Sequence, residues 1–342
     1  MTRLWWQPRS ACYWVFVLAV VGGAVALCAK LPEQLSYTAS GVLAALPVIV
    51  VGGLVVAGIL LALDVSGARV PAVILPALLW GGLAATGLAI VANGFATRGL
   101  AALLNDPTAA DWGAAIAGPI DEESLKILGV LLILVLFRSE VRRPLQGFVV
   151  GGFVGLGFQM VENITYASTF ALRDPQSDVT GALTVSALRA VTGLQSHWVY
   201  TAVFAAGLTR LLYPVGGSRA AALLLTAECG AIAYLLHFWW NAPGPASPAA
   251  AFGLIVVKGM VTVTIAVVVW LLAVRNQRLW LESMPVDPAA LSLAPPAELA
   301  TLPTGARRRA AVAYMGHYWG PQYAAVTRER QRWLLRELTR RA

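Results

Sequence analysis

The 342-residue sequence has few charged side chains: Asp, Glu, Lys and Arg make up 12% of it, whereas 58% of the residues are hydrophobic. The mean hydropathy is +0.71. Soluble domains contain about 25% charged residues, so this composition excludes an ordinary soluble domain and indicates several membrane crossings. The three cysteines, Cys12, Cys28 and Cys229, lie in apolar stretches without CxxC or Cys/His spacing. This excludes a disulfide framework and a thiolate metal site.

Acidic residues are also scarce, and the formal net charge is +8. The arginines cluster at the ends of apolar stretches and in the C-terminal segment, where they set topology and contact lipid. We therefore do not expect nucleic-acid binding.

Eight apolar stretches are long enough for the roughly 20 residues that span a bilayer core. The first lacks a small-x-small cleavage site before Lys30, so we expect it to be retained as a membrane span. The sequence predicts an all-α, polytopic transmembrane helix bundle in a cell membrane, and its Ala-, Gly- and Arg-rich composition favours the cytoplasmic membrane of a bacterium. The predicted spans are 11–29, 41–63, 71–96, 115–137, 145–171, 190–211, 220–241 and 250–274.

The distribution of positive residues predicts the orientation, because cytoplasmic loops are enriched in Lys and Arg. With the N-terminus inside, ten arginines fall on the inner side and four basic residues on the outer side. An even number of spans also places the arginine-rich C-terminal segment inside. The sequence predicts N-in, C-in topology. The inner residues are Arg3, Arg9, Arg69, Arg138, Arg142, Arg143, Arg210, Arg219, Arg275 and Arg278, and the outer ones are Lys30, Arg98, Arg173 and Arg189.

Two regions are expected: a transmembrane domain at 1–278 and a cytoplasmic segment at 279–342. Five prolines between 282 and 305 predict an extended linker. Beyond it, apolar residues recur at helical spacing among arginines, which is typical of a helix lying on an anionic inner leaflet. The alternative is a disordered basic tail. The apolar residues in question are Trp333, Leu334, Leu335 and Leu338.

An acidic patch, residues 121–126, precedes the apolar run of the fourth span. It follows Gly118-Pro119. Pro119 predicts the first turn of a helix, because backbone N–H groups in that turn make no hydrogen bond within the helix and the N–H that proline lacks is therefore not needed. Glu122 and Glu123 lie four and three residues before Lys126, so a structural ion pair is one interpretation. Ionisable residues at membrane depth more often mark a functional site.

Other polar residues fall at a similar depth in the fifth, sixth and seventh spans. With N-in topology, Glu162, His197, His237 and Asn241 lie within about 5–15 Å of the outer face at 1.5 Å per residue. We therefore predict one shared polar site with Glu122 and Glu123. A second pair, Glu228 and Lys258, is expected to be neutralised across neighbouring helices.

This set suits peptide hydrolysis. A desolvated glutamate can activate a water molecule, and His237 and Asn241 can stabilise the oxyanion. Alternatively, Glu162, His197 and His237 can hold a divalent metal such as zinc, which leaves Glu122 or Glu123 as the base. The residue types leave both mechanisms open.

Four motifs in order resemble those of the PrsW family, relatives of the CAAX prenyl endopeptidases. Glu122-Glu123-Ser-Leu-Lys126 is similar to the EExxK motif, and the segment from Phe158 to Asn163 is similar to the FxxxEN motif. The third motif of the family is a single histidine, and His197 resembles it. His237-Phe-Trp-Trp-Asn241 is similar to HxxxN. No HExxH, presenilin-type GLGD or rhomboid serine motif occurs. The resemblance covers about 115–245, with Lys126, Phe158 and Asn163 in supporting roles.

The resemblance implies an intramembrane endopeptidase that makes a site-1 cut in a single-pass membrane protein such as an anti-sigma factor. An outer-leaflet site agrees with cleavage on the extracytoplasmic side. Two alternatives remain: a non-catalytic membrane scaffold of the same superfamily, and an ion-coupled transporter that uses Glu162 and Glu228.

Overall fold

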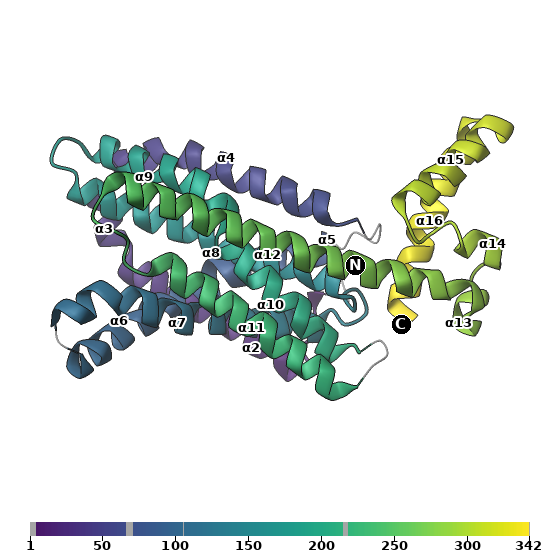
Figure 1. Ribbon diagram of the computed structural model, residues 1–342, viewed down its shortest axis with the longest axis horizontal. Helices are drawn as coiled ribbons and strands as arrows, with labels where there is room; N and C mark the ends of the chain where they lie inside the picture. The colour runs from purple at the N-terminus through teal and green to yellow at the C-terminus, as the bar shows by residue number, and fades with distance from the viewer. Residues whose placement is uncertain (1–4, 66–70, 105, 215–217, 342) are drawn as a thin grey trace.

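The computed structural model describes residues 5–65, 71–104, 106–214 and 218–341, and within these ranges every element is a helix (Figure 1). The predicted all-α class is confirmed. The membrane region comprises α2 (Ala11–Lys30), α3 (Pro32–Tyr37), α4 (Ala39–Leu63), α5 (Pro71–Leu79), η1 (Trp80–Ala85), α6 (Thr86–Leu103), α7 (Asp106–Leu136), α8 (Pro144–Arg173), α9 (Asp178–Thr192), η2 (Gly193–Gln195), α10 (His197–Leu212), α11 (Arg219–Asn241) and α12 (Pro248–Ser283). The C-terminal elements are η3 (Met284–Val286), α13 (Pro288–Leu291), α14 (Pro296–Leu299), α15 (Gly305–Trp319) and α16 (Pro321–Arg341).

Six helical segments of the described residues are long and apolar enough to cross a membrane. They correspond to the first, second, third, fifth, seventh and eighth predicted stretches. The fourth and sixth stretches fall on α7 and α10. The apolar part of α7 is interrupted by the charged residues at 121–126, and α10 has only 16 residues. The charged residues of α7 and the short length of α10 thus remove the simple hydropathy signal from these two helices.

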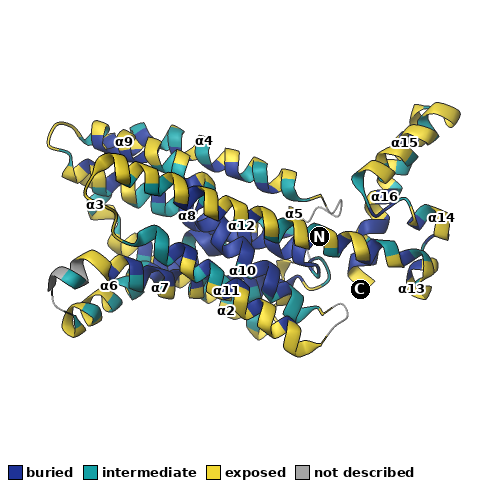
Figure 2. Cartoon of the chain, in the orientation of Figure 1, coloured by how far each residue is buried: buried dark blue, intermediate teal, exposed yellow. Residues whose placement is uncertain are grey.

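Helix α8 forms the centre of the bundle, and every residue from Pro144 to Gln159 is buried (Figure 2). It packs along α10 through glycines spaced by four: Gly147, Gly151 and Gly155. A Cβ atom on Gly155 would overlap the backbone of His197 and Trp198. Small residues at this spacing allow two membrane helices to approach closely. The glycine row therefore determines how near His197 lies to α8.

We expect Gly155→Ala to lower the stability of the protein by about 1–3 kcal/mol, because a methyl group must displace the α10 backbone. The midpoint of thermal unfolding in detergent measures the change. Gly58→Ala on α4 is the control, since nothing lies within 4 Å of its added Cβ. Equal midpoints for the two variants would show that α8 and α10 are not in tight contact at Gly155.

The π-helical turn η1 positions α7. A Cβ on Gly81 would overlap the α8 backbone, so η1 lies directly against α8. Trp80 is fully buried, and its Nε1 donates to the carbonyl oxygen of Leu125 at 2.8 Å. Gly129 provides the room for the indole ring. The acidic patch on α7 is therefore fixed by a residue from a different span, and π-turns of this kind occur frequently at functional sites.

Two helix starts differ from the sequence-based predictions. Helix α7 begins at Asp106, so Pro119 lies inside the helix and not in its first turn. Packing against α6 and α11 maintains the helix on both sides of the proline. The sixth predicted span, 190–211, is broken: α9 ends at Thr192, a short 3₁₀ turn follows, and His197 is the first residue of α10.

The C-terminal segment is folded, so the prediction of an extended linker is wrong. The prolines begin short helices, and the segment packs onto α16 in a small core of its own. Helix α12 also runs through the predicted boundary at 278/279. Leu334, Leu335 and Leu338 are buried in this core and are not free to enter a leaflet, whereas Trp333 is exposed.

The predicted pairing of Glu228 with Lys258 is also wrong. Lys258 is buried on α12, and its Nζ donates to the carbonyl oxygens of Trp240 and Ala242 at 3.1 and 3.5 Å. It therefore satisfies unpaired carbonyls at the end of α11. Glu228 is exposed on α11, whereas Glu162 pairs with Arg189 and His197, so the structure does not support a path that both glutamates line.

Candidate active site

The predicted polar residues of four helices converge on one buried region between α7, α8, α10 and α11. Glu122, Glu162, His197 and His237 lie about 14 to 18 residues from the helix ends nearest the C-terminal segment. At 1.5 Å per residue this is about 21–27 Å. The four residues therefore lie at a similar depth, nearer the far end of α8, α10 and α11 and close to the middle of α7.

The two adjacent glutamates have different surroundings. Glu123 is almost fully buried and its Oε1 is 2.9 Å from both Lys126 Nζ and His237 Nδ1. Its Oε2 accepts a 3.4 Å hydrogen bond from Thr201. Glu122 has only long contacts, at 3.4 Å to Lys126 and 3.4 Å to Asn93. The carboxylate of Glu122 is therefore the one with capacity left for another ligand.

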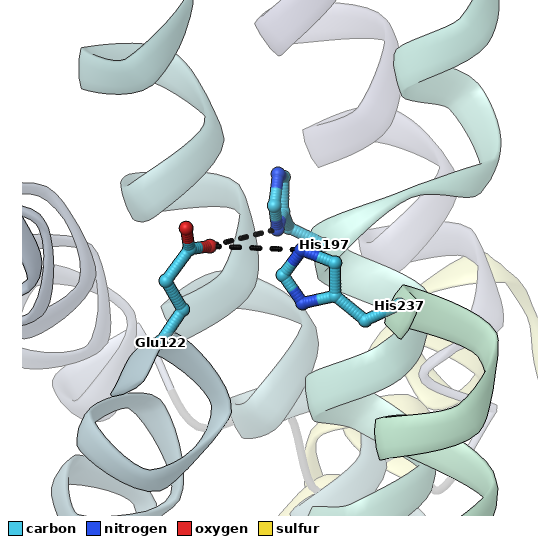
Figure 3. A group of neighbouring side chains, drawn as sticks. All are labelled: Glu122, His197 and His237. Carbon is cyan, nitrogen blue, oxygen red and sulfur yellow. Dashed lines mark ion pairs between the residues drawn. The ribbon is translucent and has the colours of Figure 1, made fainter. Parts of the chain in front are cut away.

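Both histidines direct one ring nitrogen toward Glu122 (Figure 3). Glu122 Oε2 lies 3.9 Å from His197 Nδ1 and 3.8 Å from His237 Nε2. One ligand atom from each of these three residues lies within 4.8 Å of the others. The three residues come from α7, α10 and α11, so only the tertiary structure brings them together.

The other nitrogen of each imidazole is bound by a second carboxylate. His197 Nε2 is 2.8 Å from Glu162, and His237 Nδ1 is 2.9 Å from Glu123. A carboxylate accepts the N–H of each ring, which leaves the lone pair of the nitrogen that faces Glu122. Histidines that bind metals almost always donate their other N–H in this way.

A catalytic zinc ion typically has three N or O ligands, and Glu122, His197 and His237 match the known set of two histidines and one glutamate. The residues present therefore fit a metal. The predicted metal set named Glu162 in place of Glu122. In the structure Glu162 is occupied by an ion pair with Arg189 and by His197, so Glu122 takes its position in the set.

Lys126 lies at the centre of the group. It is fully buried, its Nζ contacts both glutamates and lies 2.9 Å from His197 Nδ1, and it sits 3.8 Å above the Phe158 ring. A metal at this site would take the lone pair of His197 that now accepts from Lys126. Phe158 supports both Lys126 and the His197 ring, 5.0 Å away.

Arg189 of α9 is a site residue that the sequence analysis missed, since it was counted among the outer-loop arginines. Its guanidinium forms an ion pair with Glu162, donates to Asn163 and lies over the ring of Tyr166. The spacing of 26 residues from Asn163 contains no local signal. Its position directly before the apolar stretch 190–211, where a charge needs a partner, is the only cue in the sequence.

Asn241 lies near the group but is directed at the backbone. Its Nδ2 donates to the carbonyl oxygen of Ala114 at 3.2 Å and so bridges α11 to α7. His237 and Asn241 both face α7, as their spacing of four predicts. A Cβ on Gly118 would lie 3.2 Å from Asn241 Nδ2 and 3.6 Å from Glu122 Oε1, so both side chains approach α7 at Gly118.

Comparison with known proteins gives one family. A family model described as PrsW family intramembrane metalloprotease matches residues 70–273. The match includes α5 to α11, most of α12 and every residue of the site described above. No curated protein and no solved structure matches the chain.

Proposed function

Because the chain belongs to the PrsW family of intramembrane metalloproteases and is a peptide hydrolase, we propose that Glu122, His197 and His237 form its reaction centre. One observation supports this most strongly: each imidazole faces Glu122 with one nitrogen while a carboxylate binds the other. A structural ion pair between α7 residues would require neither histidine. A scaffold would have no need of two oriented imidazoles around one carboxylate.

In the proposed reaction, the two carboxylate oxygens of Glu122 have different roles. Oε2 faces both histidines and is the oxygen that would bind a metal, whereas Oε1, with one 3.4 Å contact to Asn93, holds the attacking water and accepts its proton. The water oxygen bonds to the scissile carbonyl carbon, and the carbonyl oxygen becomes an oxyanion. Asn241 retains one amide hydrogen after its bond to Ala114, and this hydrogen is the proposed oxyanion donor. The carbon–nitrogen bond then breaks, and the proton passes from Glu122 to the leaving amine.

The remaining residues orient this centre. Glu123 and Glu162 fix the rings of His237 and His197, and Lys126 and Arg189 balance the two carboxylates. With all three glutamates ionised and both histidines neutral, the two cations leave one negative charge uncompensated. A divalent metal held by Glu122, His197 and His237 would offset that charge and would supply a Lewis acid for the water and the scissile carbonyl.

We propose eight spans with N-in, C-in topology, which places the site toward the extracytoplasmic side. The arginine distribution and the even span number support this orientation. The proposed substrate is a single-pass membrane protein such as an anti-sigma factor, cut by site-1-type cleavage near the outer face. A prenylated cytoplasmic tail would have to reach the opposite end of the bundle, which weighs against a CAAX-type substrate.

The test uses the purified chain in liposomes with a single-pass substrate that is labelled on both sides of its span. We expect one cut near the extracytoplasmic end, about one equivalent of bound zinc per chain, and loss of cleavage after treatment with 1,10-phenanthroline. Returning zinc should restore activity, and His197→Ala and His237→Ala should lose both metal and cleavage. Full cleavage by metal-free protein would contradict the metal set but leave Glu122 as the base.

A further inference from the structure

A large cleft separates the C-terminal helices from the membrane bundle. The cleft has a volume of about 1580 Å³, and its lining comes from α15 and α16 on one side and from the end of α4 and the start of α5 on the other. Six arginines contribute to its lining, against two carboxylates, Asp64 and Glu140. None of these residues belongs to the site described above. The arginines are Arg308, Arg309, Arg328, Arg332, Arg336 and Arg340.

Four of the arginines form a single row on α16. Arg328, Arg332, Arg336 and Arg340 are spaced by four residues and so lie on one side of the helix. Arg340 pairs with Glu140 at 2.7 Å. In the described part of the chain, no carboxylate lies within ion-pair distance of the other three. Like charges at this spacing destabilise a helix. The row of arginines therefore lowers the stability of α16 unless a bound anion offsets the repulsion.

The two remaining arginines differ from each other. Arg308 is held by the carbonyl oxygens of Leu302 and Val65 at 2.7 and 3.0 Å, which attaches α15 to the end of α4. Partial burial and the neighbouring Arg309 lower the pKa of its guanidinium, whereas Asp64 opposes that shift. Arg309 is exposed and pairs with no carboxylate among the described residues. Four guanidinium groups of the cleft, those of Arg309, Arg328, Arg332 and Arg336, thus have no carboxylate partner in the described part of the chain.

An apolar cavity of about 330 Å³ adjoins the cleft. It shares Leu61, Asp64 and Pro71 with the cleft, and it extends into the bundle between α5 and α8. Apart from Gln146, its further lining is apolar and comes from Val73, Ile74, Val149, Val150 and Phe153. The combination of an arginine-lined cleft and an apolar cavity at the ends of membrane spans matches a ligand with an anionic head and a hydrocarbon tail.

We propose that the cleft and the adjoining cavity together bind one anionic phospholipid. Guanidinium groups bind phosphate oxygens through paired, charge-assisted hydrogen bonds, so the headgroup lies against Arg328, Arg332 and Arg336. An acyl chain enters past Leu61 into the apolar cavity. The headgroup level of a bilayer coincides with the end of α4 at Leu63 and the start of α5 at Pro71. A soluble phosphate would use the cleft but not the cavity.

The experiment measures binding of three probes to the full chain in non-ionic detergent by native mass spectrometry. The probes are dioctanoyl phosphatidylglycerol, dioctanoyl phosphatidylcholine and inorganic pyrophosphate. We expect the phosphatidylglycerol to bind at least about tenfold more tightly than the phosphatidylcholine. The triple variant Arg328→Gln/Arg332→Gln/Arg336→Gln should bind phosphatidylglycerol at least about tenfold more weakly than the wild-type chain does. Leu61→Trp should weaken binding of the lipid and leave binding of pyrophosphate unchanged.

The matched control is Arg278→Gln/Arg307→Gln/Arg341→Gln, which removes the same charge from exposed arginines outside the cleft. It should change lipid affinity by less than about twofold. Equal losses in the two triple variants, or equal binding of the two lipids, would overturn the proposal. Tight binding of pyrophosphate with no effect of Leu61→Trp would reassign the cleft to a soluble phosphate. If the triple variant does not fold, the single variant Arg332→Gln provides the same comparison.

Discussion

Replacing Glu122 with Gln is expected to lower the rate of peptide cleavage by about 10²- to 10⁴-fold, the usual contribution of a positioned general base. Glutamine has almost the same shape, so the fold should persist, but an amide can neither accept the proton of water nor bind a metal as a carboxylate does. Glu122 is the acid whose Oε2 faces both imidazoles and whose other contacts are long. Cleavage of the doubly labelled substrate in liposomes measures the effect.

Two variants make this prediction specific. Glu228→Gln changes a glutamate of the neighbouring helix α11 that is exposed outside the site, and it should cleave at the wild-type rate. Glu123→Gln should lower activity as well, and it should also lower stability, because Glu123 holds Lys126 and His237. Wild-type activity in Glu122→Gln would exclude Glu122 as the residue that holds the water.

Lys126→Met is expected to destabilise the protein by about 3–5 kcal/mol, the cost of leaving a buried charge without its partner. The lysine is fully buried, and its ammonium group lies within 3.4 Å of two carboxylates. Without Lys126, Arg189 is the one cation among the described residues that remains to balance the three glutamates of the site. The midpoint of thermal unfolding in detergent measures this loss.

The chain offers a matched control in Lys258, a second buried lysine of the membrane region. It donates to two carbonyl oxygens and has no carboxylate partner among the described residues, so Lys258→Met should cost only about 1–3 kcal/mol. Adding Glu123→Gln to Lys126→Met should recover part of the lost stability. If Lys126→Met unfolds no earlier than Lys258→Met, another cation, such as a bound metal, balances the glutamates.

Much of the architecture followed from hydropathy alone. Long apolar runs in a chain that must satisfy its backbone inside lipid can form only helices or closed barrels, and runs of this length select helices. Seven of the eight predicted stretches each fall on one continuous helical segment, and the sixth, 190–211, is divided between α9 and α10. The motif residues were also found from the sequence, because a charge or a histidine inside an apolar run is expensive unless it has a use.

Sequence reasoning failed where packing overrides local signals. Pro119 is a strong local marker of a helix start, yet α7 continues through it because neighbouring helices support both sides. The prolines of 282–305 indicated an extended linker, but each short helix they begin buries apolar residues against α16. The partners of Arg189 could not be predicted, because they lie on α8 and are distant from it in the sequence.

The sequence by itself determined that the glutamates, the histidines and Asn241 lie at one depth, because depth depends only on position along each helix. The tertiary structure decided the roles within that group. Which carboxylate remains open, which one binds each imidazole, and which three residues fit a metal all depend on the rotation of each helix about its axis. That rotation is set by the close contacts of Gly155 with α10 and of Trp80 with α7, which no single helix encodes.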